Sequence, residues 1–259
     1  MDGWHNATRA HPCPVCGKPD WCSISDDGRV CVCRRVPSEK LVRSGCGWIH
    51  PLGAGRTLPV RMPKPLPNAQ VDMAAVFRRL PHDEAKEQEL AATLGVELSA
   101  VKAMDAMWNG RALAWAFPMR SAEGHITGIR YRNRDGRKWS ALGSRDGLFM
   151  APDFPPTETL YVCEGPTDTL AALSMGLWAV GRSSCMSGIR HIQAYIRKHR
   201  AKAVKIIADN DFPGLNGAWI LCRHLHAGAQ IVLPPYGHKD LRQARRAASR
   251  LWYNTGIHS

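Results

Sequence analysis

The stretch at residues 157–173, Thr-Glu-Thr-Leu-Tyr-Val-Cys-Glu-Gly-Pro-Thr-Asp-Thr-Leu-Ala-Ala-Leu, sets the architecture of this chain. An apolar run of β type at 160–163 ends in Glu164-Gly165-Pro166, and a helical pattern begins directly after it. The stretch therefore predicts a strand, a tight turn and a helix. Glu164 is expected at the end of the strand, and Asp168 about one turn into the helix.

A second unit of the same kind follows at 203–222. Ala-Val-Lys-Ile-Ile-Ala runs into Asp209-Asn210-Asp211, and a Gly/Pro/Asn turn and a helical pattern come next. Because strand ends of the same sense face one crevice of a parallel sheet, we expect Glu164, Asp209 and Asp211 to converge. Such carboxylates repel each other unless a divalent cation neutralises them, and oxygen ligands suit Mg²⁺ or Mn²⁺. In the plainer interpretation, each acid is there only because the helix dipole stabilises a negative charge at a helix N-terminus. That interpretation can account for a single acid, but it accounts less well for two acidic motifs at successive strand ends.

Glu-Gly-x-x-Asp after one strand and Asp-x-Asp after a later one together resemble the Toprim domain. Bacterial-type primases, topoisomerases and some repair and nuclease proteins share this domain. The resemblance covers the C-terminal part of the chain from 157 onward, where Gly181 and Lys239-Asp240-Leu241 are similar to further family positions. The catalytic residues that it implies are Glu164, Asp168, Asp209, Asp211 and Asp240.

Composition and charge point to a nucleic-acid partner. The chain has 259 residues, of which 44% are apolar, and this predicts a buried core and two or three compact units. Its formal net charge of +13 favours a polyanion, since Lys and Arg that neutralise phosphates release counterions on binding. No run approaches the roughly 18 apolar residues of a membrane span, and the N-terminus lacks the apolar core of a signal peptide. We therefore expect an intracellular protein without a membrane partner.

Six of the nine cysteines lie within 13–46. In a reducing compartment such a group indicates metal ligation rather than disulfides. Cys13-Pro-Val-Cys16-Gly is typical of a zinc knuckle, a tight turn that presents two thiolates to one ion. Residues 21–25 and 29–34 flank Asp26-Asp27-Gly28 and predict a β-hairpin. Together these features predict a zinc ribbon.

The residues alone leave the second pair of zinc ligands open. Cys31 and Cys33 are two apart on a strand and share a face, but such a pair fits a tetrahedron less easily than a turn does. The spacing resembles the zinc ribbon that opens bacterial and phage primases, which implies Cys33 as the third ligand. Cys46 is then our fourth ligand, with Cys31 and His50 as alternatives. The other cysteines are expected to pack as small apolar residues, Cys22 beside Trp21, and elsewhere Cys163, Cys185 and Cys222.

Two basic segments follow. Residues 29–64 carry eight Lys or Arg against one Glu, which beside a zinc ribbon favours a template contact, with stacking by Trp21 or Trp48, over a solvated face. Helical spacing at 71–80, 85–94 and 99–107 precedes alternating strands that begin at 112. Arg130, Arg132 and Arg134 alternate along one strand, and seven basic residues against two acids across 120–145 favour a phosphate track.

The segment 120–149 is similar to the basic subdomain that precedes Toprim in primases. The residues implied to contact template or nucleotide are Arg130, Arg132, Lys138 and Arg145, together with Lys239. We expect a zinc ribbon at 1–52, a linker at 53–68, the basic subdomain at 69–156 and the Toprim domain at 157–259. The fold class is thus α/β, with a small β zinc ribbon, a basic α+β subdomain and a Toprim domain whose mainly parallel sheet is flanked by helices.

This order of parts resembles a bacterial-type DNA primase. The resemblance implies templated synthesis of short RNA primers on single-stranded DNA from NTPs, with structural Zn²⁺ and catalytic Mg²⁺ or Mn²⁺. It implies metal ligation by Asp209 and Asp211, and either ligation or general-base action by Glu164. Asp168 and Asp240 would orient or complete the site.

Two other functions remain open. A recombination mediator also joins a four-cysteine zinc site to Toprim and binds DNA without catalysis, but that family places a helix-hairpin-helix ahead of its zinc site, and only twelve residues precede Cys13. A Toprim nuclease lacks support, because the Toprim nucleases that we would expect carry an ATPase domain or lack a zinc ribbon. No Gly-x-x-x-x-Gly-Lys-Ser/Thr loop occurs, so we expect a separate helicase as partner, or a phage or small mobile replicon. The expected location is the cytoplasm of a bacterial or virus-infected cell.

Overall fold

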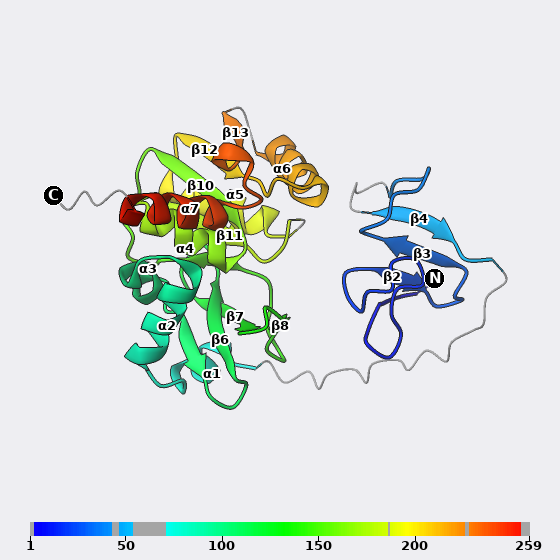
Figure 1. Ribbon diagram of the computed structural model, residues 1–259, viewed down its shortest axis with the longest axis horizontal. Coiled ribbons are helices and arrows are strands. Elements are labelled where there is room, and N and C mark those ends of the chain that lie inside the picture. The colour runs from blue at the N-terminus through cyan, green and yellow to red at the C-terminus, as the bar shows by residue number, and fades with distance from the viewer. Residues whose placement is uncertain (1–2, 43–46, 54–70, 186, 226–227, 255–259) are drawn as a thin grey trace. The chain divides into compact units, whose positions relative to one another are not determined.

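The computed structural model describes residues 3–42, 47–53, 71–185, 187–225 and 228–254. The chain divides into two compact units, residues 1–69 and 70–259 (Figure 1). Nearly all of the linker predicted at 53–68 lies outside the described ranges. Within those ranges, no helix is long and apolar enough to cross a membrane.

The N-terminal unit is a small antiparallel sheet. Its strands are β1 (Trp4–Asn6), β2 (Ser23–Ser25), β3 (Val30–Cys33) and β4 (Trp48–Pro51), in that spatial order. β2 and β3 join through the turn at 26–28, where Gly28 takes a φ of 69° and Asp27 Oδ1 accepts a 3.0 Å hydrogen bond from Arg29 N. This turn confirms the predicted hairpin. The core of the unit consists mostly of cysteines, so its apolar surface is too small to account for stability without a further cross-link.

Three helices open the larger unit: α1 (Met73–Arg78), α2 (Glu84–Leu94) and α3 (Leu98–Ala103). Asp72 and Asp83 cap the first two, because each side chain accepts a backbone N–H hydrogen bond in the first turn. Gly95, with a φ of 68°, ends α2 in the left-handed region. The helix predicted at 99–107 is shorter than expected, because Asp105 has a φ of 54° and strand β5 (Met107–Asn109) already begins two residues later.

The rest of the larger unit alternates strands with helices. The antiparallel strands are β6 (Ala114–Arg120), β7 (Ile126–Asn133), β8 (Lys138–Ser140) and β9 (Leu148–Met150). Then come β10 (Thr159–Glu164), α4 (Pro166–Ser174), β11 (Ala179–Arg182), α5 (Ile189–His199), β12 (Ala203–Ile207), α6 (Phe212–His224), β13 (Ala229–Val232), a 3-10 turn (Pro235–Gly237) and α7 (Leu241–Asn254). Both predicted strand-turn-helix units are confirmed, as β10 with α4 and as β12 with α6.

All nine strands of this unit form one sheet in the order β13-β12-β10-β11-β9-β6-β7-β8, with β5 beside β6. β10 to β13 run parallel to their neighbours within that group, and the other pairs are antiparallel. Successive side chains of β10 enter opposite cores: Cys163 packs with Leu170 of α4, and Val162 packs with Ile192 of α5. Helices therefore cover both faces of the sheet (Figure 1), which confirms the α/β class.

Two glycines fix the connection from β10 to α4. Gly165 has a φ of 84° and precedes Pro166 at the first helical position, which suits a proline because its missing N–H is not needed there. Gly181 of β11 lies under this turn, where a Cβ atom would meet Thr169 Oγ1 at 2.1 Å and the Gly165 carbonyl oxygen at 2.7 Å. The first turn of α4 thus packs directly on β11, which holds Glu164 and Asp168 at defined positions.

Candidate active site and metal centre

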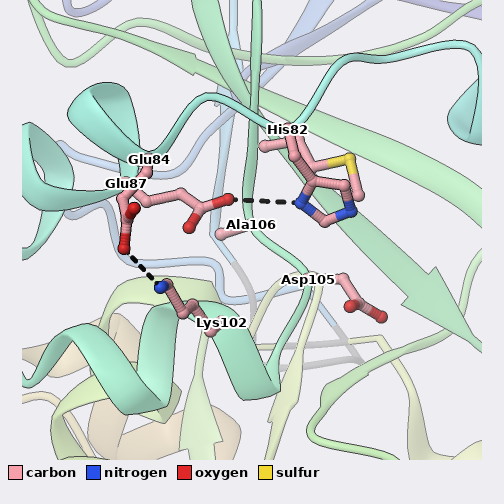
Figure 2. Close-up of a pocket in the computed structure, with 7 residues that line it drawn as sticks. His82, Glu84, Glu87, Lys102, Asp105 and Ala106 are labelled. Atoms are coloured by element: carbon pink, nitrogen blue, oxygen red, sulfur yellow. Dashed lines mark hydrogen bonds and ion pairs between the residues drawn. The ribbon is translucent and has the colours of Figure 1, made fainter.

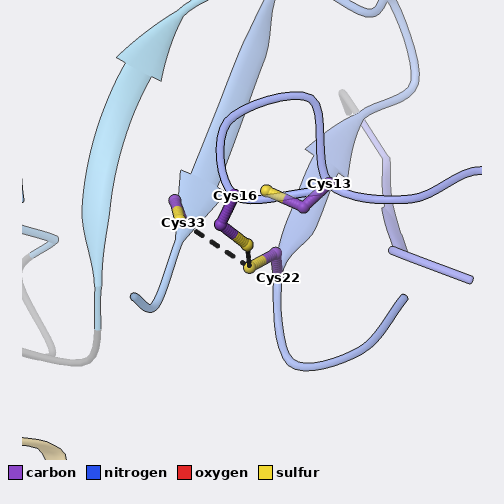
Figure 3. A group of neighbouring side chains, drawn as sticks. All are labelled: Cys13, Cys16, Cys22 and Cys33. Atoms are coloured by element: carbon purple, nitrogen blue, oxygen red, sulfur yellow. Dashed lines mark hydrogen bonds between the residues drawn. The ribbon is translucent and has the colours of Figure 1, made fainter. Parts of the chain in front are cut away.

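Four cysteines of the N-terminal unit surround one point (Figure 3). The Sγ atoms of Cys13, Cys16, Cys22 and Cys33 all lie within 4.8 Å of one another. The distance is 3.7 Å from Cys16 to Cys22 and 3.9 Å from Cys22 to Cys33. Thiolates at about 2.3 Å from a tetrahedral zinc ion are separated by about 3.8 Å. The cluster therefore fits a closed zinc site, and it is the one such group among the residues that the structure describes.

Cys22 belongs to this cluster, so the expectation that it only packs as a small apolar residue is wrong. The hairpin register gives the reason. Ser23 faces Val32 across β2 and β3, which places Cys22 opposite Cys33. A turn limited to 26–28 would pair Ser25 with Arg29 and would place Cys22 opposite Val32, whereas the observed register is shifted by one residue. The sequence therefore contained no signal for the position of Cys22.

The other three zinc ligands considered from the sequence are Cys46, Cys31 and His50. Cys46, our predicted fourth ligand, lies outside the described residues. Cys31 brings its Sγ atom to 3.5 Å from that of Cys13 but does not belong to the four-cysteine cluster. His50 Nε2 lies 3.0 Å from the carbonyl oxygen of Val36, so the backbone holds its ring.

Arg35 borders the cysteine cluster. Its Nη1 atom lies 3.9 Å from Cys16 Sγ and 3.8 Å from Cys22 Sγ. Burial raises the pKa of Cys16, but hydrogen bonds from the Lys18 backbone, from the neighbouring thiols and from Arg35 bring it down to about 7. A guanidinium beside these sulfurs stabilises the negative charge that thiolate ligands carry.

In the larger unit, Glu164 and Asp209 close two neighbouring parallel strands. Glu164 is the last residue of β10, and Asp209 follows the end of β12. The register pairs Val162 with Ile206, so Asp209 lies one step beyond the level of Glu164. Asp211 is the N-cap of α6, and Asp168 lies in the first turn of α4. The predicted meeting of strand ends is therefore present.

The five predicted acids act on one another electrostatically. Burial, together with the charges of the other four carboxylates, raises the pKa of Asp209 to about 8. Burial and the charge of Asp240 raise the pKa of Asp168 to about 6. The five acids thus share one region. Their oxygens are less tightly gathered than the cysteine sulfurs, since among the described residues only the cysteines form a group of three or more whose ligand atoms all lie within 4.8 Å of one another.

Glu164 carries a polar atom without a partner. Its Oε2 atom is buried and makes no hydrogen bond to any described residue. Burial raises the pKa of Glu164, while the charge of Arg182 lowers it. A buried carboxylate oxygen without a donor at the end of a strand has the chemistry of a ligand for a hard divalent cation.

The other acids also hold the local backbone. Asp211 caps α6, and its Oδ2 atom lies 3.3 Å from Lys239 Nζ. Asp240 accepts a 2.7 Å hydrogen bond from a backbone N–H of α7, and Asp168 accepts one of 3.1 Å from Arg242 N. These hydrogen bonds position the carboxylates of Asp168 and Asp240. Lys239, a predicted phosphate contact, instead forms an ion pair with Asp211 of the same group of acids.

The basic side chains of β7 and β8 lie near these acids. Arg132 is the cross-strand partner of Lys138, which is exposed. Desolvation by the surrounding protein and the charge of Arg132 nevertheless lower the pKa of Lys138, while Asp168 and Glu164 act in the opposite direction. Desolvation lowers the pKa of Arg130 as well. Positive and negative side chains predicted from separate motifs therefore lie within electrostatic range of one another.

Two other arginines lie elsewhere. Arg134 does not share the face of Arg130 and Arg132, because β7 ends at residue 133 and the guanidinium of Arg134 binds Glu89 at 2.7 and 2.8 Å. Arg145 is exposed in the segment before β9. Within the described residues, no hydrogen bond or ion pair joins its side chain to the acids.

The larger unit also contains a pocket of about 380 Å³ (Figure 2), and no predicted site residue lines it. Its lining consists of His82, Glu84, Glu87, Lys102, Asp105, Ala106 and Met107. Glu87 pairs with His82 at 3.4 Å, Glu84 with Lys102 at 2.7 Å, and Asp105 with Arg120. Each acid of the lining therefore already contacts a nitrogen-bearing side chain.

Known structures share the fold of this chain. The DnaG primase catalytic domain bound to ssDNA matches with a TM-score of 0.51 and 15% identity, over 71% of this chain and 75% of that one. The DnaG catalytic core matches with a TM-score of 0.52 and 16% identity, over 71% of this chain and 78% of that one. The E. coli primase catalytic core matches with a TM-score of 0.50 and 16% identity, over 71% of this chain and 82% of that one. No family model matches, and no curated protein matches. The chain therefore has the fold of primase catalytic cores.

Proposed function

We propose that this protein, which has a primase-core fold, is a DNA primase that synthesises short RNA primers on single-stranded DNA. The observation that carries the proposal is the common region of Glu164, Asp168, Asp209, Asp211 and Asp240, within electrostatic range of Arg132 and Lys138. Nucleotidyl transfer needs acidic side chains that hold cations and basic side chains that hold phosphates. Both occur here around the carboxyl ends of two parallel strands.

Each acid has a role that its position supports. Mg²⁺ or Mn²⁺, when bound, would supply Lewis-acid stabilisation of the attacking 3′-hydroxyl and the leaving pyrophosphate. Asp209 and Asp211 would ligate the ion, and the unpartnered Oε2 of Glu164 would either join them or accept the proton of the hydroxyl. Asp168 and Asp240, each fixed by a backbone hydrogen bond, would orient the site.

The N-terminal unit would serve template selection. Cys13, Cys16, Cys22 and Cys33 would hold one structural zinc ion, consistent with sulfur separations close to those of a tetrahedral site. A unit held together in this way would present the exposed Trp21 side chain to single-stranded DNA. The guanidinium carbon of Arg35 lies 4.9 Å from the centre of the Trp21 ring. A separate replicative helicase would supply the unwound template.

The decisive test is primer synthesis. The full chain is incubated with single-stranded DNA, labelled NTPs and Mg²⁺ or Mn²⁺, and short RNA products are separated by size. Asp209→Asn should reduce synthesis by about 100-fold or more, because metal ions supply several kcal/mol of transition-state stabilisation. Asp153→Asn, an exposed acid that is not among the predicted site residues, is the matched control. Binding to DNA should survive Asp209→Asn, since less negative charge repels phosphate less.

A binding protein of recombination-mediator type gives a different result. Such a protein makes no product in the wild type with either ion, and its DNA affinity does not depend on Asp209. Undiminished synthesis by the Asp209→Asn, Asp211→Asn double variant would instead place the catalytic centre outside these motifs.

A further inference from the structure

Helix α6 exposes its large apolar side chains and buries its small ones. Phe212, Leu215 and Trp219 are 52%, 39% and 57% exposed. The buried residues of the helix are Gly214, Gly217, Ala218 and Leu221. A surface helix normally turns its large apolar residues toward the core, so this arrangement is reversed over most of α6. We refer to Phe212, Leu215 and Trp219 below as the α6 stripe.

Close backbone contacts maintain the reversed orientation. A Cβ atom at Gly214 would meet the Asp209 carbonyl oxygen at 2.6 Å, and one at Gly217 would meet the Cys185 carbonyl oxygen at 2.5 Å. Both glycines allow α6 to lie directly against the segments that follow β12 and β11. Rotation of the helix to bury Trp219 would bring larger side chains into these contacts, so the α6 stripe must face outward.

The α6 stripe begins beside the proposed metal carboxylates. Phe212 follows Asp211, the N-cap of the helix. Positions 212, 215 and 219 lie on one face because they are three and four residues apart, and Trp219 lies about 10 Å along the axis from Phe212. Arg223, four residues further, places its guanidinium carbon 5.1 Å from the centre of the Trp219 ring. The stripe is therefore a row of aromatic and apolar surface that leads away from the acids and ends in a cation.

The charge of α6 itself favours a polyanion. The helix carries no Asp or Glu from Phe212 to His224. Its last turn carries Arg223 and His224, and Arg223 contacts the stripe at Trp219. Positive charge would not strengthen the binding of an apolar protein partner. A nucleic acid can bind both kinds of group, because its phosphates contact the cations and its bases stack on the aromatic rings.

We propose that the α6 stripe is a stacking platform for bases of the single-stranded DNA template beside the carboxylate site. Phe212 and Trp219 stack with bases, Leu215 contacts the base between them, and Arg223 reinforces Trp219 through its cation–π contact. Recognition of this kind tolerates every base, because each one has a π-face. The identity of the strand as template rests on the proposed function, whereas the stacking itself does not.

The test measures binding of the full, zinc-loaded chain to an oligo(dT) and to an oligonucleotide of the same length with a central abasic tract. Trp219→Ala should weaken oligo(dT) binding by about 5- to 150-fold, the range for one lost base–aromatic stack. The salt dependence should stay unchanged, because no phosphate contact is lost. Wild type and Trp219→Ala should bind the oligonucleotide with the abasic tract with equal affinity. Trp219→Phe should retain most of the affinity, and Phe212→Ala should resemble Trp219→Ala.

The matched control is Met175→Ala at the end of α4, which removes an apolar side chain that is 52% exposed, as Phe212 is. Equal affinity of wild type and Trp219→Ala for oligo(dT) would overturn the platform, even if primers are made. A weaker self-association of Trp219→Ala in sedimentation, with unchanged DNA binding, would overturn it in favour of a protein contact. If the wild type makes no primers but Trp219→Ala still loses oligo(dT) affinity, the platform stands and the proposed function fails.

Discussion

Arg182 lies directly opposite Glu164 across the parallel strands β11 and β10. The arginine is only 2% exposed, and its Nη1 atom donates a 2.6 Å hydrogen bond to the carbonyl oxygen of Cys185. Burial raises the pKa of Glu164, and the charge of Arg182 opposes that rise. A buried guanidinium therefore compensates part of the negative charge of the acid site before any cation binds.

This pairing predicts that Arg182→Met destabilises the protein strongly. The substitution removes the buried positive charge that offsets Glu164 and also removes the hydrogen bond to the Cys185 carbonyl oxygen, so the free energy of unfolding should fall by about 3 kcal/mol or more. Urea denaturation in buffer without divalent ions measures it. Arg190→Met, which removes an exposed cation of α5, should change stability by at most about 0.5 kcal/mol. Equal stability of Arg182→Met and wild type would show that the site needs no built-in cation.

The raised pKa of Asp209 predicts a pH dependence. Its folded-state value of about 8 lies above the ordinary carboxyl value, so the folded protein keeps a proton that the unfolded chain has already lost. The contribution of this group to stability is fully present below about pH 4 and is lost as the pH rises through about 8. Thermal unfolding without Mg²⁺ should therefore show that wild type loses more stability than Asp209→Asn between about pH 6 and about pH 8.

Added Mg²⁺ or Mn²⁺ should reverse that loss, because the cation takes the place of the proton. The rise in Tm on adding the ion should therefore be larger at about pH 8 than at about pH 6 in wild type, and nearly absent in Asp209→Asn. A rise in Tm that is the same at both pH values would mean that the ion binds elsewhere.

The basic pair on β7 and β8 predicts a change in salt dependence. If Arg132 and Lys138 hold phosphates, replacing either by Ala should lower the slope of log affinity against log salt by about 0.7 for a single strand. Titration of single-stranded DNA at several salt concentrations measures the slope. Arg134→Ala is the matched control, since its guanidinium is already paired with Glu89. A slope that neither variant alters would assign this pair to an ordinary solvated surface.

The cysteine cluster predicts one bound zinc ion per chain. Elemental analysis should find it in wild type and in Cys222→Ser, whose cysteine lies on α6, but not in Cys22→Ser or Cys33→Ser, because a tetrahedral site needs all its ligands. Cys46→Ser should retain the ion. Zinc that is lost in Cys46→Ser and kept in Cys22→Ser would restore our first choice of fourth ligand.

Local sequence alone determined the elements that carry the chemistry. The apolar run before Glu164, the Gly-Pro turn and the helical spacing after it specify strand, turn and helix, because each depends on neighbours a few residues away. The same holds for the existence of the hairpin around residues 26–28, but its exact register, which places Cys22 opposite Cys33, came only from the structure. The convergence of Glu164 with Asp209 also followed from sequence, since parallel strands align their carboxyl ends.

Only the tertiary structure decided which groups are buried and which faces are exposed. Nothing near Arg182 in the sequence indicates that it lies opposite Glu164, because that position depends on which strands are neighbours in the sheet. The pKa of Asp209 depends on burial and on acids from four other elements or turns. The outward orientation of Trp219 depends on Gly217, which meets the Cys185 carbonyl oxygen, because the segment after β11 comes against α6 only in the tertiary structure.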